Sequence, residues 1–391
     1  MPPWPVRLLW VTAEPPDRAL GGGNIRQARL LDAITCAADV DLLVAGGVPD
    51  DKTVAAVRRV TQVPVRVRRD GSTLRRRVLN LQLALGRQGP VERWAARPAR
   101  DALAAALDDS SYDIVIVQHA GLATLLPPRR NATWIAELHN VASGSAADSA
   151  RLAAGRRQRW VREREAAAAR RLEAWIVRSY DAVVSVSPAD AALLPGDSVV
   201  IPNGVDVPAT TAGLPEAPRL LFSGTLGYGP NVDGLLWFAR EVWPLVRQRV
   251  PEARWDIAGR APTPAVSALG ELPGVAVHPD VPDMAPYVAA ARVAVVPLRF
   301  GTGTRLKVLE AWAAGRPVVG TSIGLMGLDY EPGVHALVAD DAGGLADATV
   351  TALGDGTTAG HLADAGRALV LDKYDWSQIG RAYGDFLRSF S

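Results

Sequence analysis

The sequence has very little cysteine and no long apolar stretch. Its 391 residues include a single cysteine, Cys36, so no disulfide can form within the chain and no cysteine cluster is available for a metal. An Asp-X-Asp pattern at Asp39 to Asp41 begins a buried strand pattern and is a poor metal site. No apolar run reaches the roughly 20 residues that a membrane-spanning helix needs. The start, MPPWPVRLLWVTAEPP, lacks the apolar centre and cleavage site of a signal peptide, so we expect a cytoplasmic protein.

The net charge is also small, at +2. Neither of the arginine-rich helical patterns comes with a nucleic-acid recognition motif, so no nucleic acid partner is expected. The stretch from Arg75 to Arg100 mixes arginine with apolar residues in a helix-like pattern. It could lie against an anionic membrane surface, which would make the protein membrane-peripheral, or it could be an ordinary solvated helix. The second basic pattern, Arg156 to Tyr180, predicts a long helix packed on a sheet.

Strand-like apolar runs alternate with helical patterns along the chain, which is typical of parallel α/β sheets. A length of 391 residues is too great for one ordinary core and suits two domains. Residues 201–218, rich in Pro, Gly, Asn and Thr, separate two sets of strand runs. The sequence therefore predicts two doubly wound α/β domains, residues 1–205 and 206–373. The strand runs of the first set are Val6 to Ala13, Val40 to Gly46, Asp113 to Ala120, Thr133 to Asn140 and Ala182 to Pro188, and the second set extends from Arg219 to Ser322.

A glycine-rich loop runs into a helix in the segment FGTGTRLKVLEAWAAGRPVVGTSIG, Phe300 to Gly324. Gly301 and Gly303 would let backbone N–H groups approach a ligand closely, and the positive end of the following helix favours a phosphate there. Arg305 and Lys307 add positive charge to the first helical turn, where it is unfavourable unless an anion offsets it. We expect both side chains to face solvent when no ligand is bound.

Three further candidate binding features lie near the ends of the predicted strands and helices. Glu310 could accept hydrogen bonds from paired sugar hydroxyls, or it could be a solvated residue of an amphipathic helix. The glycines of residues 21–23 precede a helix and could hold a phosphate, although such a triplet also serves as an ordinary turn. His139 ends a strand run, where it is either a ligand contact or a structural histidine. Because open α/β sheets bind ligands beyond the carboxyl ends of their strands, we expect two domains facing across a cleft, with His139 on its wall.

These motifs resemble those of the GT-B fold glycosyltransferases, in particular the retaining enzymes similar to glycosyltransferase family 4. The resemblance covers nearly the whole chain, and its most specific part is LEAWAAGRPVV followed by GLDYEPGVHALVADD. It also implies that a C-terminal helix, residues 374–391, crosses back onto the first domain. The positions that match the family are the glycine loop at Gly22 and Gly23, the histidine His139, the NGVD segment from Asn203 to Asp206, and Gly224 of FSGTL.

The chain departs from the family pattern at two places. Many members carry a glutamate eight residues before the helix glutamate, where this chain has Thr302. Many also carry Arg and Lys shortly after the strand that ends in FSG, whereas TLGYGPNVDG contains no cation. We expect Arg305 and Lys307 to neutralise the diphosphate instead, with Thr302, Gly303 and Thr304 at the donor.

The resemblance implies transfer of a sugar from a nucleotide-diphosphate sugar to an acceptor hydroxyl, with retention of configuration and with no metal or other cofactor. The acceptor, a small molecule, a glycan or a glycolipid, would bind on the N-terminal domain. His139 would hold the donor sugar and Glu310 the ribose, while Arg305 and Lys307 stabilise the departing diphosphate. Two alternatives stay open: an isomerising or hydrolysing enzyme that acts on nucleotide sugars, and a module that binds them without chemistry.

Overall fold

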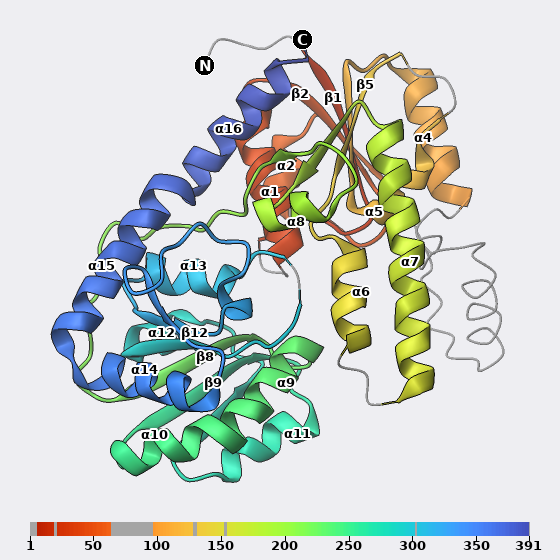
Figure 1. Ribbon diagram of the computed structural model, residues 1–391. Helices are drawn as coiled ribbons and strands as arrows, with labels where there is room; N and C mark the ends of the chain where they lie inside the picture. The colour runs from red at the N-terminus through yellow and green to blue at the C-terminus, as the bar shows by residue number, and fades with distance from the viewer. Residues whose placement is uncertain are drawn as a thin grey trace. The chain divides into compact units, whose positions relative to one another are not determined.

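The computed structural model describes residues 6–18, 22–63, 97–127, 131–151, 155–301 and 303–390. The chain forms two compact units (Figure 1). The N-terminal unit consists of Met1–Asn203 together with Ser377–Ser391, and the C-terminal unit consists of Gly204–Trp376.

The N-terminal unit is built on a parallel sheet of seven strands in the order β3-β2-β1-β4-β5-β6-β7. Its strands are rich in Val, Ile and Leu because a parallel sheet covered on both faces buries each strand on both sides, as β4 shows. The strand order reverses between β1 and β4, and α/β sheets bind ligands at the carboxyl ends of such a pair. The strands are β1 (Arg7–Thr12), β2 (Asp39–Val44), β3 (Arg59–Gln62), β4 (Ile114–Gln118), β5 (Thr133–Glu137), β6 (Ala182–Ser185) and β7 (Val199–Val200).

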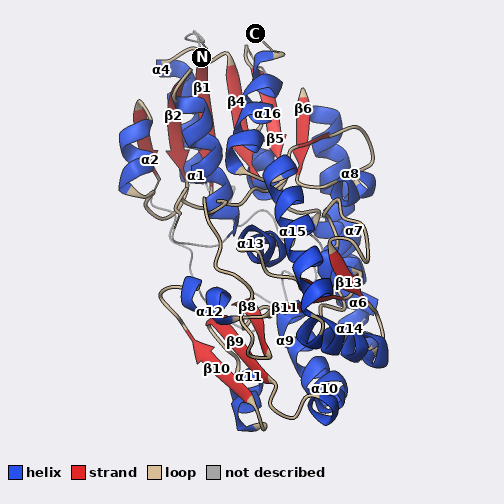
Figure 2. Cartoon of the chain, turned by 90° about the vertical axis from the view of Figure 1, so that its left-hand side faces the viewer, coloured by secondary structure: helices blue, strands red, loops and turns tan. Residues whose placement is uncertain are grey.

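Helices cover both faces of this sheet. Figure 2 shows α1 (Gly22–Thr35), α2 (Asp51–Ala56) and α16 (Trp376–Arg388) in front of the strands, and Figure 1 shows α4 (Arg97–Asp109) and α7 (Arg156–Ser179) on the other side. The helix α16 packs closely on α1, because a Cβ atom at Gly380 would lie 2.6 Å from the Cβ of Ala33. The remaining helices of the unit are α5 (His119–Leu122), α6 (Ala142–Arg151) and α8 (Pro188–Leu193).

The two basic patterns of the sequence fall in this unit. The long helix predicted from Arg156 to Tyr180 is α7, and its buried residues, such as Ala169 and Ile176, lie from Ala166 onward. Residues 75–96 of the other basic stretch lie outside the described residues, and Arg97 to Arg100 form the start of α4. Among the helices that the structure describes, none is long and apolar enough to cross a membrane.

The C-terminal unit repeats the arrangement with six parallel strands in the order β10-β9-β8-β11-β12-β13. Its core packs Trp255 and Phe222 of the sheet against Phe238 and Trp312. The reversal of strand order lies between β8 and β11. The strands are β8 (Arg219–Thr225), β9 (Arg254–Arg260), β10 (Val275–Pro279), β11 (Val293–Val296), β12 (Val318–Gly320) and β13 (Ala336–Val338); the helices are α9 (Gly229–Trp237), α10 (Trp243–Arg249), α11 (Pro264–Ser267), α12 (Ala285–Ala290), α13 (Leu306–Ala313), α14 (Ala342–Gly354) and α15 (Gly356–Lys373).

The predicted fold class, two doubly wound domains with parallel sheets, is confirmed. Sequence analysis missed the strands β3, β7 and β13. β3 has the sequence RVTQ, with only one apolar residue, and β7 and β13 have only two and three residues, so none of them formed a run that the pattern analysis selected.

Candidate active site

The strand reversal in the C-terminal unit brings Gly224, at the end of β8, near the loop that follows β11. Gly224 has φ +140°, a backbone conformation that favours glycine. A Cβ atom at this position would lie 3.0 Å from Lys307 Nζ and 3.3 Å from Asn231 Nδ2. The glycine therefore leaves room for the amine beside the backbone.

The amine of Lys307 is held by two neighbours from other elements. Its Nζ donates a hydrogen bond of 3.0 Å to Asn231 Oδ1 and lies 3.7 Å from the centroid of the Phe222 ring. Burial and, to a smaller extent, the positive charge of Arg305 lower the pKa of Lys307 to about 7, while Glu310 acts in the opposite direction. Near neutral pH this amine is therefore poised between its neutral and charged forms, and a bound anion would favour the charged form.

Asn231 was missed by sequence analysis. Its Nδ2 donates to the carbonyl of Thr225 at 2.8 Å, which fixes the amide so that Oδ1 faces Lys307. The signal was the segment PNVDG, which we had noted only for its lack of a cation. The structure shows that its asparagine orients the cation that Lys307 supplies from α13.

Arg305 is buried, with 6% of its surface exposed, so the expectation that it faces solvent is wrong. It stands directly before α13, and its Nη2 donates to the carbonyl of Gly301 at 2.6 Å while its Nε donates to that of Ile323 at 3.2 Å. These two carbonyls belong to the glycine loop and to the turn after β12, and sequence spacing does not reveal that they converge. Arg305 therefore shapes the loop and brings positive charge to Lys307 from within the protein.

The rest of the predicted donor loop has the conformation that its glycines suggest. Gly301 has φ +112° and Gly303 has φ +86°, so both positions favour glycine for backbone reasons. The carbonyl of Thr304 accepts from the N–H of Leu306 at 3.2 Å where α13 begins. Thr302 lies outside the described residues. Glu310 is exposed on α13.

In the N-terminal unit, the start of α1 lies against His139. A Cβ atom at Gly23 would lie 3.0 Å from His139 Nδ1 and 3.8 Å from His119 Cε1, so a larger residue would require the His139 ring to shift, whereas the contact with His119 would be an ordinary one. Gly22 is the first residue of the same helix. The structure thus brings the predicted residues Gly22, Gly23 and His139 together.

His119 completes this group and was also missed. It follows β4, its ring centroid lies 4.0 Å from that of His139, and its φ of +66° is unusual for a residue other than glycine. Such strain is held only where the surrounding structure requires it. The available signal was the strand run from Asp113 to Ala120. Its second-to-last residue is His119, and the strand lies next to the reversal of strand order.

A buried hydrogen-bond chain determines which nitrogen of His139 carries the proton. The carboxylate of Glu137 accepts from Arg26 Nε at 2.7 Å, from Gln118 Nε2 at 2.9 Å and from Tyr383 Oη at 3.0 Å. Since a carboxylate only accepts, Gln118 must face it with its amide nitrogen and present Oε1 to His139 Nε2, 2.6 Å away. His139 therefore donates through Nε2 and leaves Nδ1 as an acceptor beside Gly23.

Both histidine rings are kept neutral by their surroundings. Burial lowers the pKa of His139 well below the usual value, and His119 and Arg26 lower it further. Burial also lowers the pKa of His119, against the opposing charges of Glu14 and Glu137. Within the described part of the chain, His139 Nδ1 and His119 Nε2 are buried without a hydrogen-bond partner. The site therefore offers an unused acceptor of the kind that binds a ligand hydroxyl.

The Asp-X-Asp pattern serves the fold. Asp41 is buried, accepts from Tyr112 Oη at 2.8 Å and is paired with Arg58. Considering only the residues placed by the structure, no group of three or more His, Cys, Asp or Glu side chains could hold a metal ion.

Comparison with known proteins relates both units to glycosyltransferases. Residues 38–208 match the family model Glycosyltransferase Family 4, and residues 217–355 match the model Glycosyl transferases group 1. The structure of sucrose-phosphate synthase from Thermosynechococcus elongatus is similar with a TM-score of 0.72, at 19% identity and 98% coverage of both chains. The structure of HepE from Anabaena in complex with UDP and glucose has a TM-score of 0.67, at 14% identity, with 98% of this chain and 100% of that chain covered.

An uncharacterised 44.6 kDa protein in the cps region of Klebsiella pneumoniae is 28% identical over 131 residues, which are 32% of this chain and 34% of that protein. The chain thus matches about a third of the length of this curated relative. The two family models lie on successive parts of the chain and together take in most of it, and the fold agrees with both solved structures. The chain is therefore a glycosyltransferase of the GT-B type that resembles glycosyltransferase family 4.

Proposed function

We propose that this glycosyltransferase moves a sugar from a nucleotide-diphosphate sugar to an acceptor hydroxyl, with retention of anomeric configuration and without a metal ion. The observation that carries the proposal is the amine of Lys307, held by Asn231 beside the positive-φ glycine Gly224. A diphosphate bound at Gly224 would draw a proton onto Lys307 and be stabilised by it. The titratable cation supplies the charge that a divalent metal supplies to diphosphates elsewhere.

In the proposed reaction, the bond between the sugar and the diphosphate breaks while the acceptor oxygen attacks the same face of the sugar. Negative charge grows on the departing phosphate oxygen, and Lys307, Arg305 and the start of α13 stabilise it. The acceptor hydroxyl passes its proton to that oxygen. Arg305 acts from within the protein because its guanidinium is already bonded to the carbonyls of Gly301 and Ile323.

The remaining predicted residues take roles in binding. His139 would accept a hydrogen bond from a hydroxyl of the donor sugar through Nδ1, which its bond to Gln118 leaves unprotonated. Glu310 would accept from the ribose hydroxyls of the nucleotide. The complex of HepE with UDP and glucose supports a nucleoside diphosphate as the leaving group in a protein of this fold. We infer a small molecule, glycan or glycolipid as the acceptor.

A panel of nucleotide sugars tests the proposal. The full chain is incubated with each donor, with and without a mixture of sugar and lipid acceptors, in buffer containing EDTA. Release of nucleoside diphosphate is measured, and the anomeric configuration of the product is read by NMR. The expected result is one preferred donor, a product with the donor's configuration and a rate insensitive to EDTA.

Other outcomes would identify the alternatives. Conversion of the donor without transfer would support an isomerising or hydrolysing enzyme, and tight binding without turnover would support a binding module. A product of inverted configuration would reject the proposed mechanism while leaving the transferase activity.

A further inference from the structure

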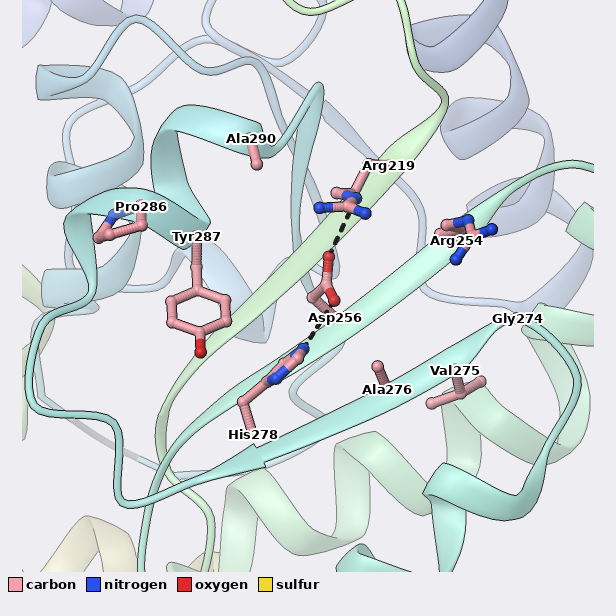
Figure 3. Close-up of a pocket in the computed structure, with 10 residues that line it drawn as sticks. All are labelled: Arg219, Arg254, Asp256, Gly274, Val275, Ala276, His278, Pro286, Tyr287 and Ala290. Carbon is pink, nitrogen blue, oxygen red and sulfur yellow. Dashed lines mark hydrogen bonds and ion pairs between the residues drawn. The ribbon is translucent and has the colours of Figure 1, made fainter.

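The C-terminal unit contains a pocket of about 540 Å³ that the proposed reaction does not use. It lies over the first residues of three neighbouring strands, at Arg219 of β8, Arg254 of β9 and Val275 of β10 (Figure 3). Gly224 is five residues further along β8, so the two places are roughly 16 Å apart along that strand. The pocket therefore belongs to the opposite edge of the sheet from the proposed diphosphate site.

The pocket exists because a short helix covers only part of one face of the sheet. Alternate residues of a strand share a face, so Arg219 lies on the same side as Leu221, and Asp256 on the same side as Ala258. Leu221 and Ala258 pack under the six-residue helix α12 with Tyr287. Beyond the end of α12 the same face carries Arg219 and Asp256, which line the pocket together with Arg254.

The carboxylate of Asp256 is already paired with two neighbouring side chains. Asp256 is 8% exposed, and its two carboxylate oxygens lie 3.3 Å from Arg219 Nε and 2.8 Å from His278 Nε2. Figure 3 shows its carboxylate between these two side chains. Because both oxygens are occupied, Asp256 orients Arg219 and His278 and repels a ligand anion only weakly.

Several donors around this pair are unused. Among the residues that the structure describes, the guanidinium of Arg254 has no hydrogen bond or ion pair, and that of Arg219 has none beyond Asp256. The hydroxyl of Tyr287 likewise has no partner within the described chain, and its ring lies 4.7 Å from that of His278, centroid to centroid. Two cations and a phenol thus border a pocket whose volume lies in the range of small-molecule sites, about 300 to 1,000 Å³.

We propose that this pocket is a second ligand site, which binds a small organic anion carrying a phosphate or carboxylate group. Arg254 and Arg219 bind the anionic group, because guanidinium groups pair with both kinds of oxyanion. The apolar part of the ligand packs against Ala276, which lies on the same face of the sheet as Asp256 and His278, and against the ring of Tyr287. The site is independent of the proposed transfer reaction and of the sugar donor.

Calorimetric titration of the full chain tests this site with three probes that share one ring. Phenyl phosphate and benzoate carry the two anionic groups, and phenol carries none. We expect at least one anion to bind and phenol not to bind. Arg254→Ala should weaken that binding roughly tenfold or more, the usual effect of losing a hydrogen bond to a charged group. Because Arg254 is exposed, its replacement should not disturb folding.

Two variants serve as controls for the location of the anion. Arg249→Ala removes another exposed arginine of the same unit, one paired with Asp347, and should leave the affinity unchanged. Lys307→Ala alters the proposed diphosphate site and should also leave it unchanged. The proposal is overturned if neither anion binds at millimolar concentration, if phenol binds as well as the anions, if Arg249→Ala weakens binding as much as Arg254→Ala, or if only Lys307→Ala abolishes binding.

Discussion

Lys307 and His139 are both bases that burial makes harder to protonate, yet their hydrogen bonds give them different uses. The partner of Lys307 is a neutral amide oxygen, so the amine can gain a proton when an anion arrives. The partner of His139 is Gln118, whose orientation the carboxylate of Glu137 determines. His139 is therefore suited to accept a hydrogen bond from a hydroxyl through Nδ1 while its ring stays neutral. In the proposed reaction, similar burial would thus give a cation for the phosphate and a hydrogen-bond acceptor for the sugar.

Binding of a nucleoside diphosphate should take up a proton at Lys307. With a pKa of about 7 in the free protein, this amine is mostly neutral near pH 8, and the diphosphate raises its pKa again. Calorimetric titrations of a nucleoside diphosphate in buffers with different ionisation enthalpies would measure the uptake. We expect close to one proton per ligand at about pH 8 and less near pH 6, where the amine is already charged.

Lys307→Arg is the matched control, because arginine stays charged at these pH values. It should retain part of the affinity and lose the proton uptake; an unchanged uptake would assign the proton to another group.

The lowered pKa of Lys307 also makes the stability of the folded protein depend on pH. Since the folded pKa lies below that of an unfolded lysine, the unfolded chain binds more protons between about pH 7 and 10.5, and the free energy of unfolding rises with pH across this window.

At the scale of elements, Gly23 determines how closely α1 approaches the histidine pair. Gly23→Ala would place a Cβ atom 3.0 Å from His139 Nδ1, where the proposed sugar hydroxyl binds. We expect a fall in kcat/KM of roughly tenfold or more, the usual effect of displacing a bound group by a fraction of an ångström to an ångström. The helix itself should not be weakened, because alanine is the better helix former. Steady-state kinetics and thermal unfolding together measure both effects.

Gly360→Ala in α15 is the control for this substitution. A Cβ atom there meets nothing within 4 Å, so the variant should be stabilised by up to about 1 kcal/mol with normal kinetics. Equal kinetics for Gly23→Ala and the wild type would show that the histidine pair does not contact the substrate.

The sequence predicted the loops of the candidate site better than their side-chain contacts. Glycines before a helix and at strand ends indicate a backbone conformation that other residues rarely adopt. Gly301 and Gly303 were recognised for this reason, and both have positive φ. Asn231 and His119 were missed because the order of the strands, and not their spacing along the chain, brings them to Lys307 and His139. The same cause explains the wrong expectation for Arg305, whose partner carbonyls come from two separate loops.

At the scale of the whole molecule, the N-terminal unit is assembled from two distant parts of the chain. Its last segment, Ser377–Ser391, carries most of α16. From this helix Tyr383 donates to Glu137 and packs edge-on against Trp10, with ring centroids 6.3 Å apart. The hydrogen-bond chain that orients His139 therefore includes Tyr383, which lies close to the C-terminal end of the sequence. The neighbours of Lys307 described above, Asn231, Phe222 and Gly224, in contrast belong to the continuous segment Gly204–Trp376.

Removing residues 377–391 should therefore separate the two halves of the proposed chemistry. We expect faster hydrogen exchange throughout the N-terminal unit, because the truncated chain loses the packing of α16 and one hydrogen bond to the buried Glu137, itself worth about 1.5–3 kcal/mol. Sugar transfer should be lost, while calorimetry should still detect the nucleoside diphosphate, since Gly224, Asn231 and Lys307 remain in an intact unit.

Tyr383→Phe keeps the helix and removes only the hydroxyl, so it should lower transfer and stability to a smaller extent. If truncation abolished nucleotide binding while exchange in the C-terminal unit stayed slow, residues of the N-terminal unit would have to contribute to the nucleotide site, and the assignment of the diphosphate to the C-terminal unit alone would fail.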